Sequence, residues 1–217
     1  MIEFHHHESL NSVPWAVALG VVSAYGVNLG ALEAVLASAQ EAVSFGAPEA
    51  MKRIQAFESF FDQNGFRSPL GYQLKRIQEK GLPGGSPVVR ALLLCEMSTG
   101  LLMGAQDASA IKGTLVCDLA QEGESFSGMR EEVLCRKDEI VLKDEEGVIA
   151  TLFQGPDHRT RLKKDTKDIV FFIFSAPGVS AAEVREGVWK VHSVLQRACS
   201  EIQVQVYESR TPLVEVD

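Results

Sequence analysis

The spacing of hydrophobic residues changes several times along the first half of the chain. Residues 15–25 (WAVALGVVSAY) form a continuous Val-rich apolar run that ends at Gly26 and Asn28, which predicts a buried strand. Apolar residues then recur every three or four positions, which predicts helices over residues 29–43, 48–63 and 70–80. Residues 88–99 (VVRALLLCEMST) are almost wholly apolar, so we expect them to form a helix at the centre of the protein.

The second half of the chain changes from helical to strand periodicity. From Thr114 onward, Gly, Asp and Glu turns separate short runs rich in Val, Ile and Phe: LVCDLA, EEVLCRKD, EIVLKD, GVIATLFQ and DIVFFIFS. Residues 179–202 return to helical spacing, with Ser180 as the N-cap and Glu183 at the capping-box position. Residues 203–216 are expected to form a last strand and a loose end. The order of elements predicts an α+β fold, in which helices pack on a largely antiparallel sheet.

Residues 13–217 are expected to form a single α+β domain. A candidate sub-boundary lies at residues 81–87 (GLPGGSP), which carry the strongest cluster of backbone-breaking residues in the chain. Residues 1–12 are expected to be a flexible N-terminus. They include the triplet His5-His6-His7, which has no further His or Cys at metal-ligand spacing, so we predict no metal site there.

Composition narrows the class of protein. The chain has 217 residues, 46% of them hydrophobic, and a formal net charge of −8, so it has the makeup of a globular protein without an extended basic face for duplex DNA. The apolar run at residues 13–22 is too short to span a bilayer and has no Lys or Arg before it, so neither a signal peptide nor a membrane anchor is predicted. The four cysteines lie far apart with no C-x-x-C pair, which is typical of reduced thiols in the cytoplasm.

One segment is strongly basic in an otherwise acidic chain. Residues 155–168 (GPDHRTRLKKDTKD) carry five Arg and Lys side chains in a loop between two predicted strands. The segment is either a solvated turn or a clamp for phosphate or carboxylate, to which Arg donates two hydrogen bonds at once. His158 in this loop is a candidate general base near neutral pH, although no Ser or Cys nucleophile accompanies it.

A second candidate lies at residues 103–107 (MGAQD), after the apolar helix. Gly104 leaves room for a ligand to approach the backbone, and Gln106 and Asp107 offer polar groups at the edge of a pocket; an ordinary turn at the end of a helix explains the segment equally well. The chain has no P-loop, G-x-G-x-x-G, H-E-x-x-H or G-x-S-x-G motif, so the commoner NTPases, dehydrogenases, metalloproteases and hydrolases are excluded and no cofactor is predicted.

Several stretches occur together in an order that is specific to one family. They are GLPGGSPVV (81–89), GLLMGAQDASAIKG (100–113), EGE (122–124), DEEGVIA (144–150) and HRTRLKKDT (158–166) leading into DIVFFIF. In this order and spacing the chain resembles stand-alone proteins built on the editing domain of the beta chain of bacterial phenylalanyl-tRNA synthetase. The resemblance covers residues 15–200.

The resemblance implies an α+β domain that recognises the aminoacyl end of a tRNA and, in the synthetase, hydrolyses wrongly attached tyrosine. A second, hydrolytic site is needed there because an apolar pocket rejects an added hydroxyl group poorly. The water is positioned by the pocket and by the substrate itself, which would explain the absence of a conventional triad.

This chain departs from the synthetase pattern at polar positions in three segments. The synthetase's L-H-A-F-D falls on MGAQD, so Gly104 occupies the position of the His; its Thr-Asn pair falls on Leu92 and Leu93; and the acidic residue of its G-G-E segment falls on His158. The predicted pocket is therefore more apolar than that of the synthetase, and binding is easier to defend than hydrolysis.

We carry three hypotheses forward. The first is that the protein binds tRNA or the aminoacyl end of tRNA, with hydrolysis of mischarged aminoacyl-tRNA in trans as an open extension. The second is a non-catalytic module that binds a free amino acid, a small metabolite or a protein, because Leu92 and Leu93 beside a glycine-rich entry suit an apolar ligand. The third is an enzyme acting on an unrelated small substrate. Under the first hypothesis, phosphate is contacted by Arg159, Arg161, Lys163 and Lys164, the aminoacyl pocket is lined by Leu92, Leu93, Gly104, Gln106, Asp107 and Thr160, and His158 is the base.

Overall fold

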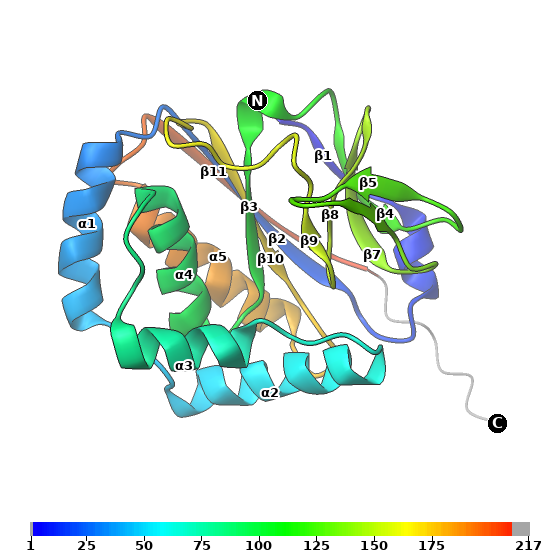
Figure 1. The fold of residues 1–217 in the computed structure, drawn as a ribbon, viewed down its shortest axis with the longest axis horizontal. Helices are drawn as coiled ribbons and strands as arrows, with labels where there is room; N and C mark the ends of the chain where they lie inside the picture. The colour runs from blue at the N-terminus through cyan, green and yellow to red at the C-terminus, as the bar shows by residue number, and fades with distance from the viewer. Residues whose placement is uncertain (1, 210–217) are drawn as a thin grey trace.

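The computed structural model describes residues 2–209, which form a four-stranded sheet, a five-stranded sheet, a two-stranded hairpin and the helices packed around them (Figure 1). The helices of four or more residues are η1 (Glu8–Ser12), α1 (Leu29–Ala42), α2 (Pro48–Gln63), α3 (Leu70–Lys80), α4 (Pro87–Thr99) and α5 (Ala181–Leu195). This arrangement confirms the predicted α+β fold with a largely antiparallel sheet.

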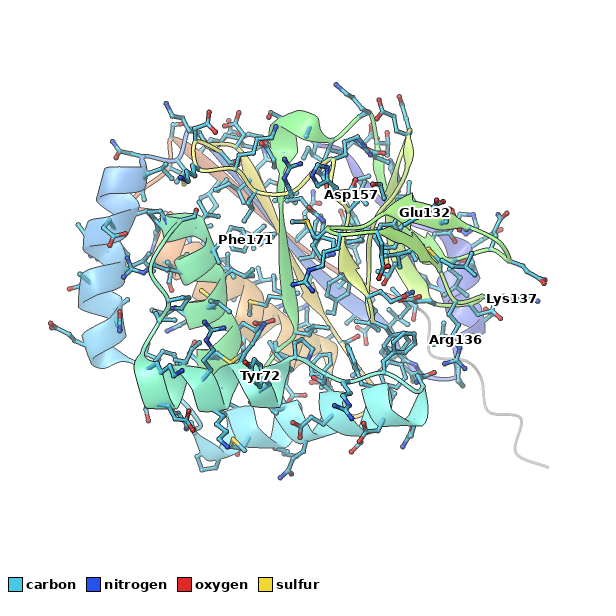
Figure 2. The ribbon with its side chains drawn as sticks, in the orientation of Figure 1. Tyr72, Glu132, Arg136, Lys137, Asp157 and Phe171 are labelled. Atoms are coloured by element: carbon cyan, nitrogen blue, oxygen red, sulfur yellow. The ribbon has the colours of Figure 1, made fainter. Side chains whose placement is uncertain are left out.

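A four-stranded antiparallel sheet runs through the middle of the molecule. Its strands are ordered β11-β2-β10-β3, with bounds β2 (Ala18–Tyr25), β3 (Met103–Asp107), β10 (Ile169–Phe174) and β11 (Glu201–Glu208). The inner strand β10 pairs with β2 on one side and with β3 on the other, and all its side chains are buried. Figure 2 shows Phe171 of this strand in the interior, between the helices and the sheet.

Helix α5 packs closely on the central sheet because two glycines leave room for neighbouring side chains. A Cβ on Gly20 of β2 would lie 2.4 Å from Val188 Cγ2, and a Cβ on Gly187 of α5 would lie 2.6 Å from Leu101 Cδ1. The helix begins with the predicted capping box, in which Ser180 and Glu183 each bond the other's backbone. It ends at Leu195, so the predicted helix over residues 179–202 was too long.

The helices of the first half form as their sequence pattern predicts. Asn28 caps α1 through its side chain, α2 spans the predicted residues 48–63, and α3 and α4 follow. Helix α4 stops at Gly100, whose φ of 71° is left-handed and whose missing Cβ would lie against the Ala50 backbone. In Figure 1, α2 and α3 lie along the lower edge of the molecule, below α4 and the central sheet.

The second sheet covers the side of the molecule away from α1 (Figure 1). Its strand order is β1-β4-β7-β8-β9, with bounds β1 (Phe4–His6), β4 (Leu115–Leu119), β7 (Ile140–Asp144), β8 (Gly147–Thr151) and β9 (Gly155–Pro156). A short hairpin of β5 (Ser125–Ser127) and β6 (Glu132–Leu134) extends from it, and Gly128 next to β5 bridges to Asp157.

The N-terminal residues differ from the flexible segment that we expected. Strand β1 pairs in parallel with β4, Phe4 and Leu10 are buried, and the Phe4 ring lies 4.6 Å from that of Tyr207. Sequence spacing does not reveal such a pairing, because its partner lies more than a hundred residues away. Strand β11 confirms the first part of the strand predicted over residues 203–216, while residues 210–216 of that segment lie outside the described part of the chain.

Two further expectations were that the cysteines are reduced and that no segment of the chain anchors it in a membrane. Cys95, Cys117, Cys135 and Cys199 are free, and burial raises the pKa of Cys95 and Cys117 to about 12, so these two thiols stay protonated. No helix within residues 2–209 combines the length and the apolar character that crossing a membrane requires.

The buried N-terminal strand leads to a stability prediction. Phe4→Ala should lower the free energy of unfolding by about 3 kcal/mol, because it removes an aromatic ring from the core and leaves a cavity. Urea unfolding followed by circular dichroism measures this. His5→Ala is the matched control, since the His5 side chain is exposed and should change stability by less than about 0.5 kcal/mol. Equal stability of both variants would contradict an ordered β1.

Candidate ligand pocket

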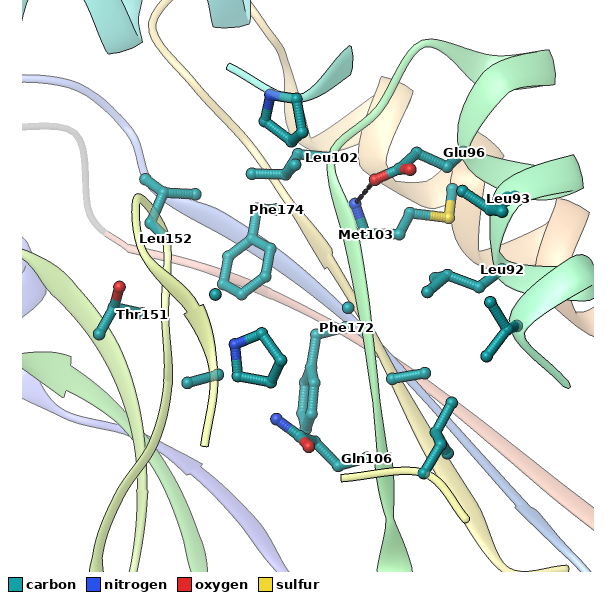
Figure 3. A pocket seen from close by; sticks show the side chains of 18 of the residues that line it. Leu92, Leu93, Glu96, Leu102, Met103, Gln106, Thr151, Leu152, Phe172 and Phe174 are labelled. Carbon is teal, nitrogen blue, oxygen red and sulfur yellow. Dashed lines mark hydrogen bonds between the residues drawn. The ribbon is translucent and has the colours of Figure 1, made fainter. Parts of the chain in front are cut away.

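A cavity of about 530 Å³ opens between α4, β3 and the hairpin of β8 and β9 (Figure 3). Its walls are mostly apolar, and they bring together segments from seven helices and strands and the loops beside them. The residues that line it are Phe61, Pro69, Gln73, Val89, Leu92, Leu93, Glu96, Leu102, Met103, Gly104, Ala105, Gln106, Met129, Ala150, Thr151, Leu152, Phe153, Gly155, Pro156, Arg161, Leu162, Phe172 and Phe174.

The central sheet forms the floor of this cavity. Phe172 and Phe174 alternate with the residues of β10 that face α5, and Gly104 of β3 lies directly opposite Phe172 in the strand register. A Cβ on Gly104 would meet only Phe174, at 3.9 Å, so the glycine leaves open space above the sheet. Residues 103–107 form strand β3 rather than the turn that we considered, and Gly104 is among the residues that line the pocket.

One face of α4 forms a wall of the cavity. Val89, Leu92, Leu93 and Glu96 recur every three or four residues and therefore share one side of the helix. The structure thus brings Leu92 and Leu93 to the same cavity as Gly104. Val89 is 37% exposed and Met129 of the β5–β6 hairpin is 52% exposed, so these two residues mark the mouth.

Gln106 and Thr160 are brought together, but as a structural pair. Gln106 is only 1% exposed; its Nε2 donates to the Ile149 carbonyl at 3.0 Å, and its Oε1 lies 2.9 Å from Thr160 Oγ1. Thr160 is fully buried, and its amide donates to Asp157 Oδ1 at 2.9 Å. Gln106 is part of the pocket wall with both ends of its amide engaged, whereas Thr160 does not line the pocket, contrary to our prediction.

Asp107 also holds the protein together rather than lining the pocket. Its amide donates to the Thr160 carbonyl at 2.7 Å, and its Oδ2 accepts from Thr166 Oγ1 at 3.0 Å. Its other carboxylate oxygen accepts from the Ser109 amide and hydroxyl. Asp107 therefore ties the loop of residues 157–168 to β3, and its predicted place in the pocket was wrong.

Arg159 in the basic loop is engaged by carboxylates of this chain. Its Nη2 donates to Asp144 Oδ1 at 2.8 Å, its Nε lies 3.2 Å from Glu146 Oε2, and its Nη1 donates to the Ala110 carbonyl. Burial works to raise the pKa of Asp144, but the bonds from Arg159 and from the backbone outweigh it and hold that pKa below its usual value. Arg159 therefore has a structural role, because its Nη1, Nη2 and Nε all contact oxygens of this chain and few of its donors remain for phosphate.

The other basic side chains of the loop are more available. Arg161 lines the pocket, and its Nη1 contacts the carbonyl and Nδ1 of His158 at 2.5 and 3.1 Å. Lys163 and Lys164 are exposed, with Lys163 Nζ 4.0 Å from Asp107 Oδ2. His158 itself is exposed and is not among the residues that line the pocket. The loop thus places Arg161 in the pocket wall and two lysines just beyond it, while the candidate base lies outside.

Glu96 is the pocket residue that sequence reasoning missed. It is 3% exposed, its Oε1 accepts from the Met103 amide at 3.0 Å (Figure 3), and burial raises the pKa of its carboxyl to about 8 although that hydrogen bond works to lower it. Glu96 and Arg161 are the titratable residues among those that line the cavity. The signal was present in the sequence, since Glu96 is the lone acid in the apolar run VVRALLLCEMST.

Comparison with known proteins finds a family model that matches the part of the chain around the pocket. A family model described as the B3/4 domain matches residues 67–187, a range that holds every residue of the pocket lining except Phe61. Among solved structures, the chain is similar to an N-terminal fragment of the phenylalanyl-tRNA synthetase beta-subunit from Pyrococcus horikoshii, with a TM-score of 0.54 and 12% identity. The match covers 96% of this chain and 54% of that fragment, so this chain spans about half its length, and at this identity the likeness is one of fold. No curated protein sequence matches the chain.

The buried pair of Gln106 and Thr160 leads to a prediction. Thr160→Val keeps the shape of the side chain but removes the hydroxyl, so it should lower the free energy of unfolding by about 2 kcal/mol, because the buried Gln106 Oε1 loses its partner and Asp157 keeps only the Thr160 amide of its two bonds to this residue. Chemical denaturation measures the change. Thr114→Val, at a half-buried position outside this network, is the control. A Thr160 variant as stable as the control would show that the network contributes nothing.

The buried acid leads to a pH prediction. The folded state holds the Glu96 proton up to about pH 8, whereas the unfolded chain releases it near 4.5, so the folded state binds more protons between these values. This contribution to stability is full below pH 4.5 and is lost as the pH rises toward 8, with a slope of up to about 1.4 kcal/mol per pH unit. Glu96→Gln keeps an oxygen for the Met103 amide and cannot titrate. Unfolding of both proteins by urea from pH 5 to pH 8 should show the variant gaining on the wild type as the pH rises; parallel profiles would contradict the buried acid.

Proposed function

The chain belongs to the B3/4 domain family, and from this premise we propose that it binds the aminoacyl end of a tRNA, with the aminoacyl group in the pocket. The similar structure is a fragment of a phenylalanyl-tRNA synthetase beta-subunit, which supports a role related to tRNA. We propose in addition that the protein acts in the cytoplasm, where free cysteines such as those of this chain stay reduced.

One observation carries this proposal, namely that the apolar cavity and the basic loop share a wall. Arg161 and Leu162 line the cavity, and the exposed Lys163 and Lys164 follow directly in the chain. An aminoacylated tRNA end has the same layout, with an amino acid side chain at its tip and phosphates behind it. The pocket suits the first part, and the cations of the loop suit the second.

The charge of the protein limits how much of the tRNA it contacts. The chain carries a net charge of −8, and Arg159 is paired with Asp144 and Glu146. Contacts spread along a duplex stem would therefore meet repulsion. The proposed contact is confined to the single-stranded end, where Arg161, Lys163 and Lys164 supply the positive charge.

Hydrolysis of mischarged tRNA in trans is an extension of this proposal. The titratable groups in the pocket wall are Glu96 and Arg161, and His158 lies outside it, so hydrolysis would depend on a water held by the substrate itself. Binding is the part of the function that the geometry supports best.

A second candidate function is binding of a free amino acid or small metabolite. The observation in its favour is that the cavity wall is mostly apolar and that only Arg161 of the loop's arginines reaches it. Added salt separates the two candidates, because phosphate contacts weaken steeply with ionic strength whereas burial in an apolar pocket does not.

The proposal predicts the effect of removing the free cations. The double variant Arg161→Ala/Lys164→Ala should bind aminoacylated tRNA about tenfold more weakly and should flatten the salt dependence of log K by about 1.4, which is the value expected for two lost contacts to single-stranded phosphates. Filter binding or fluorescence anisotropy between low and physiological salt measures both quantities.

The control is Lys137→Ala, an exposed lysine of the β6–β7 turn at the far edge of the molecule (Figure 2). It removes positive charge away from the pocket and should leave affinity and salt slope near those of the wild type. Equal loss in both proteins would indicate non-specific attraction. Release of labelled amino acid from correctly and wrongly charged tRNAs, measured in parallel, decides whether binding leads to hydrolysis.

A further inference from the structure

The closed end of the pocket holds an acid without a counter-ion. Glu96 is 3% exposed, whereas Val89 and Met129 at the mouth are substantially exposed, so Glu96 lies deep in the cavity. Its Oε1 accepts from the Met103 amide, and no ion pair of Glu96 occurs among the described residues. Burying a carboxyl group without a cation is costly, and burial raises the pKa of this group to about 8.

The charged groups on the elements around α4 are engaged with one another rather than with Glu96. Arg53 of α2 pairs with Glu183 and Glu186 of α5, and Arg90 pairs with Glu33 of α1. The charge of Lys190 of α5 works to lower the pKa of Cys95, which lies on another side of α4. Arg161 reaches the pocket from the loop of residues 157–168, and within that loop it contacts His158.

A second hydrogen-bond acceptor in the wall also lacks a partner. Gln73 of α3 lines the pocket, and its side-chain oxygen is buried without a hydrogen bond. Glu96 and Gln73 thus add acceptor oxygens to a mostly apolar wall. A ligand that fits must bring donors for them, and a cation satisfies the acid better than a neutral donor because charges interact strongly in a poorly solvated site.

We propose that this pocket binds a primary ammonium group on an apolar body, with Glu96 as its counter-ion and Gln73 as a further acceptor. The inference rests on the proposed function in one respect: in an aminoacyl-tRNA the group would be the α-ammonium of the attached amino acid, with its apolar side chain against Leu92, Leu93 and Phe172. Glu96 thereby gives the pocket selectivity for ligands with a free amine.

The pairing changes the protonation of the site in a defined way. Near neutral pH the empty pocket holds Glu96 as the neutral acid, and the ligand arrives as an ammonium ion. Formation of the ion pair leaves a carboxylate bonded to the ammonium and releases the carboxyl proton to solvent. Binding should therefore release up to one proton for each ligand bound.

The test uses two small probes and the full-length protein. L-phenylalaninamide carries the free amine, and its N-acetyl derivative has the same body without it. Calorimetry and NMR titration at pH 7 should show at least tenfold tighter binding of the amine, and calorimetry in two buffers of different ionisation enthalpy should show proton release for the amine alone. Equal affinities, no binding of either probe, or no proton release would overturn the proposal.

Two variants complete the test. Glu96→Gln retains an oxygen for the Met103 amide, and it should weaken binding of the amine at least tenfold and leave the N-acetyl probe unchanged. Gly104→Leu should abolish binding of both probes, because its side chain enters the space that the glycine leaves open. If Glu96→Gln fails to fold, proton release by the wild type still decides. Binding of the amine without binding of tRNA would contradict the proposed function alone, and the reverse result would contradict this inference alone.

Discussion

Strand β10 lies inside the four-stranded sheet with all its side chains removed from solvent, so both of its faces must be covered. Ile173 faces α5, where Gly20 and Gly187 permit close packing. Phe172 and Phe174 face the other way, toward α4 and the second sheet. On that side the cover is incomplete, because Gly104 contributes no side chain above Phe172. The pocket is thus the part of the second face of β10 that the fold leaves open to a ligand.

The segment of residues 159–166 (RTRLKKDT) serves mainly to hold this opening in shape. Thr160 and Thr166 bond to the two polar residues of β3, and Arg159 bonds to Asp144 at the end of β7. These contacts fix the loop to both sheets at once. Arg161 lies between the fixed points, and its side chain reaches the cavity wall. A motif that looks like a ligand clamp in sequence therefore divides into anchors and a single residue directed at the site.

Sequence was a good guide where structure is local. The capping box of Ser180 and Glu183 and the periodicity of α2 depend on residues a few positions apart. It failed where the partner is distant: β1 pairs with a strand more than a hundred residues away, and β3 is a strand because it pairs with β10 although Gly104 and Asp107 favour a turn. Polar residues were the hardest to place, since the side chains of Thr160 and Asp107 have the same chemistry whether they bond a ligand or, as here, other residues of the chain. Glu96 was missed because a single acid does not change the apolar pattern of the helix, and the sequence does not show that its carboxyl is buried.

Glu96 affects the stability of the empty protein and the binding of a cation in opposite directions. A leucine at this position would fill the same wall without the cost of a buried carboxyl, leaving only the Met103 amide without a partner. The acid therefore lowers the stability of the empty protein at neutral pH. That loss is offset only when a cation enters, and a group that binds the folded state alone stabilises it.

The polar positions that the synthetase pattern places on α4 and β3 are Leu92, Leu93 and Gly104 in this chain, so recognition depends on burial of an apolar body and on one charge deep in the cavity. Such a site discriminates by the presence of the amine and by the size of the body attached to it.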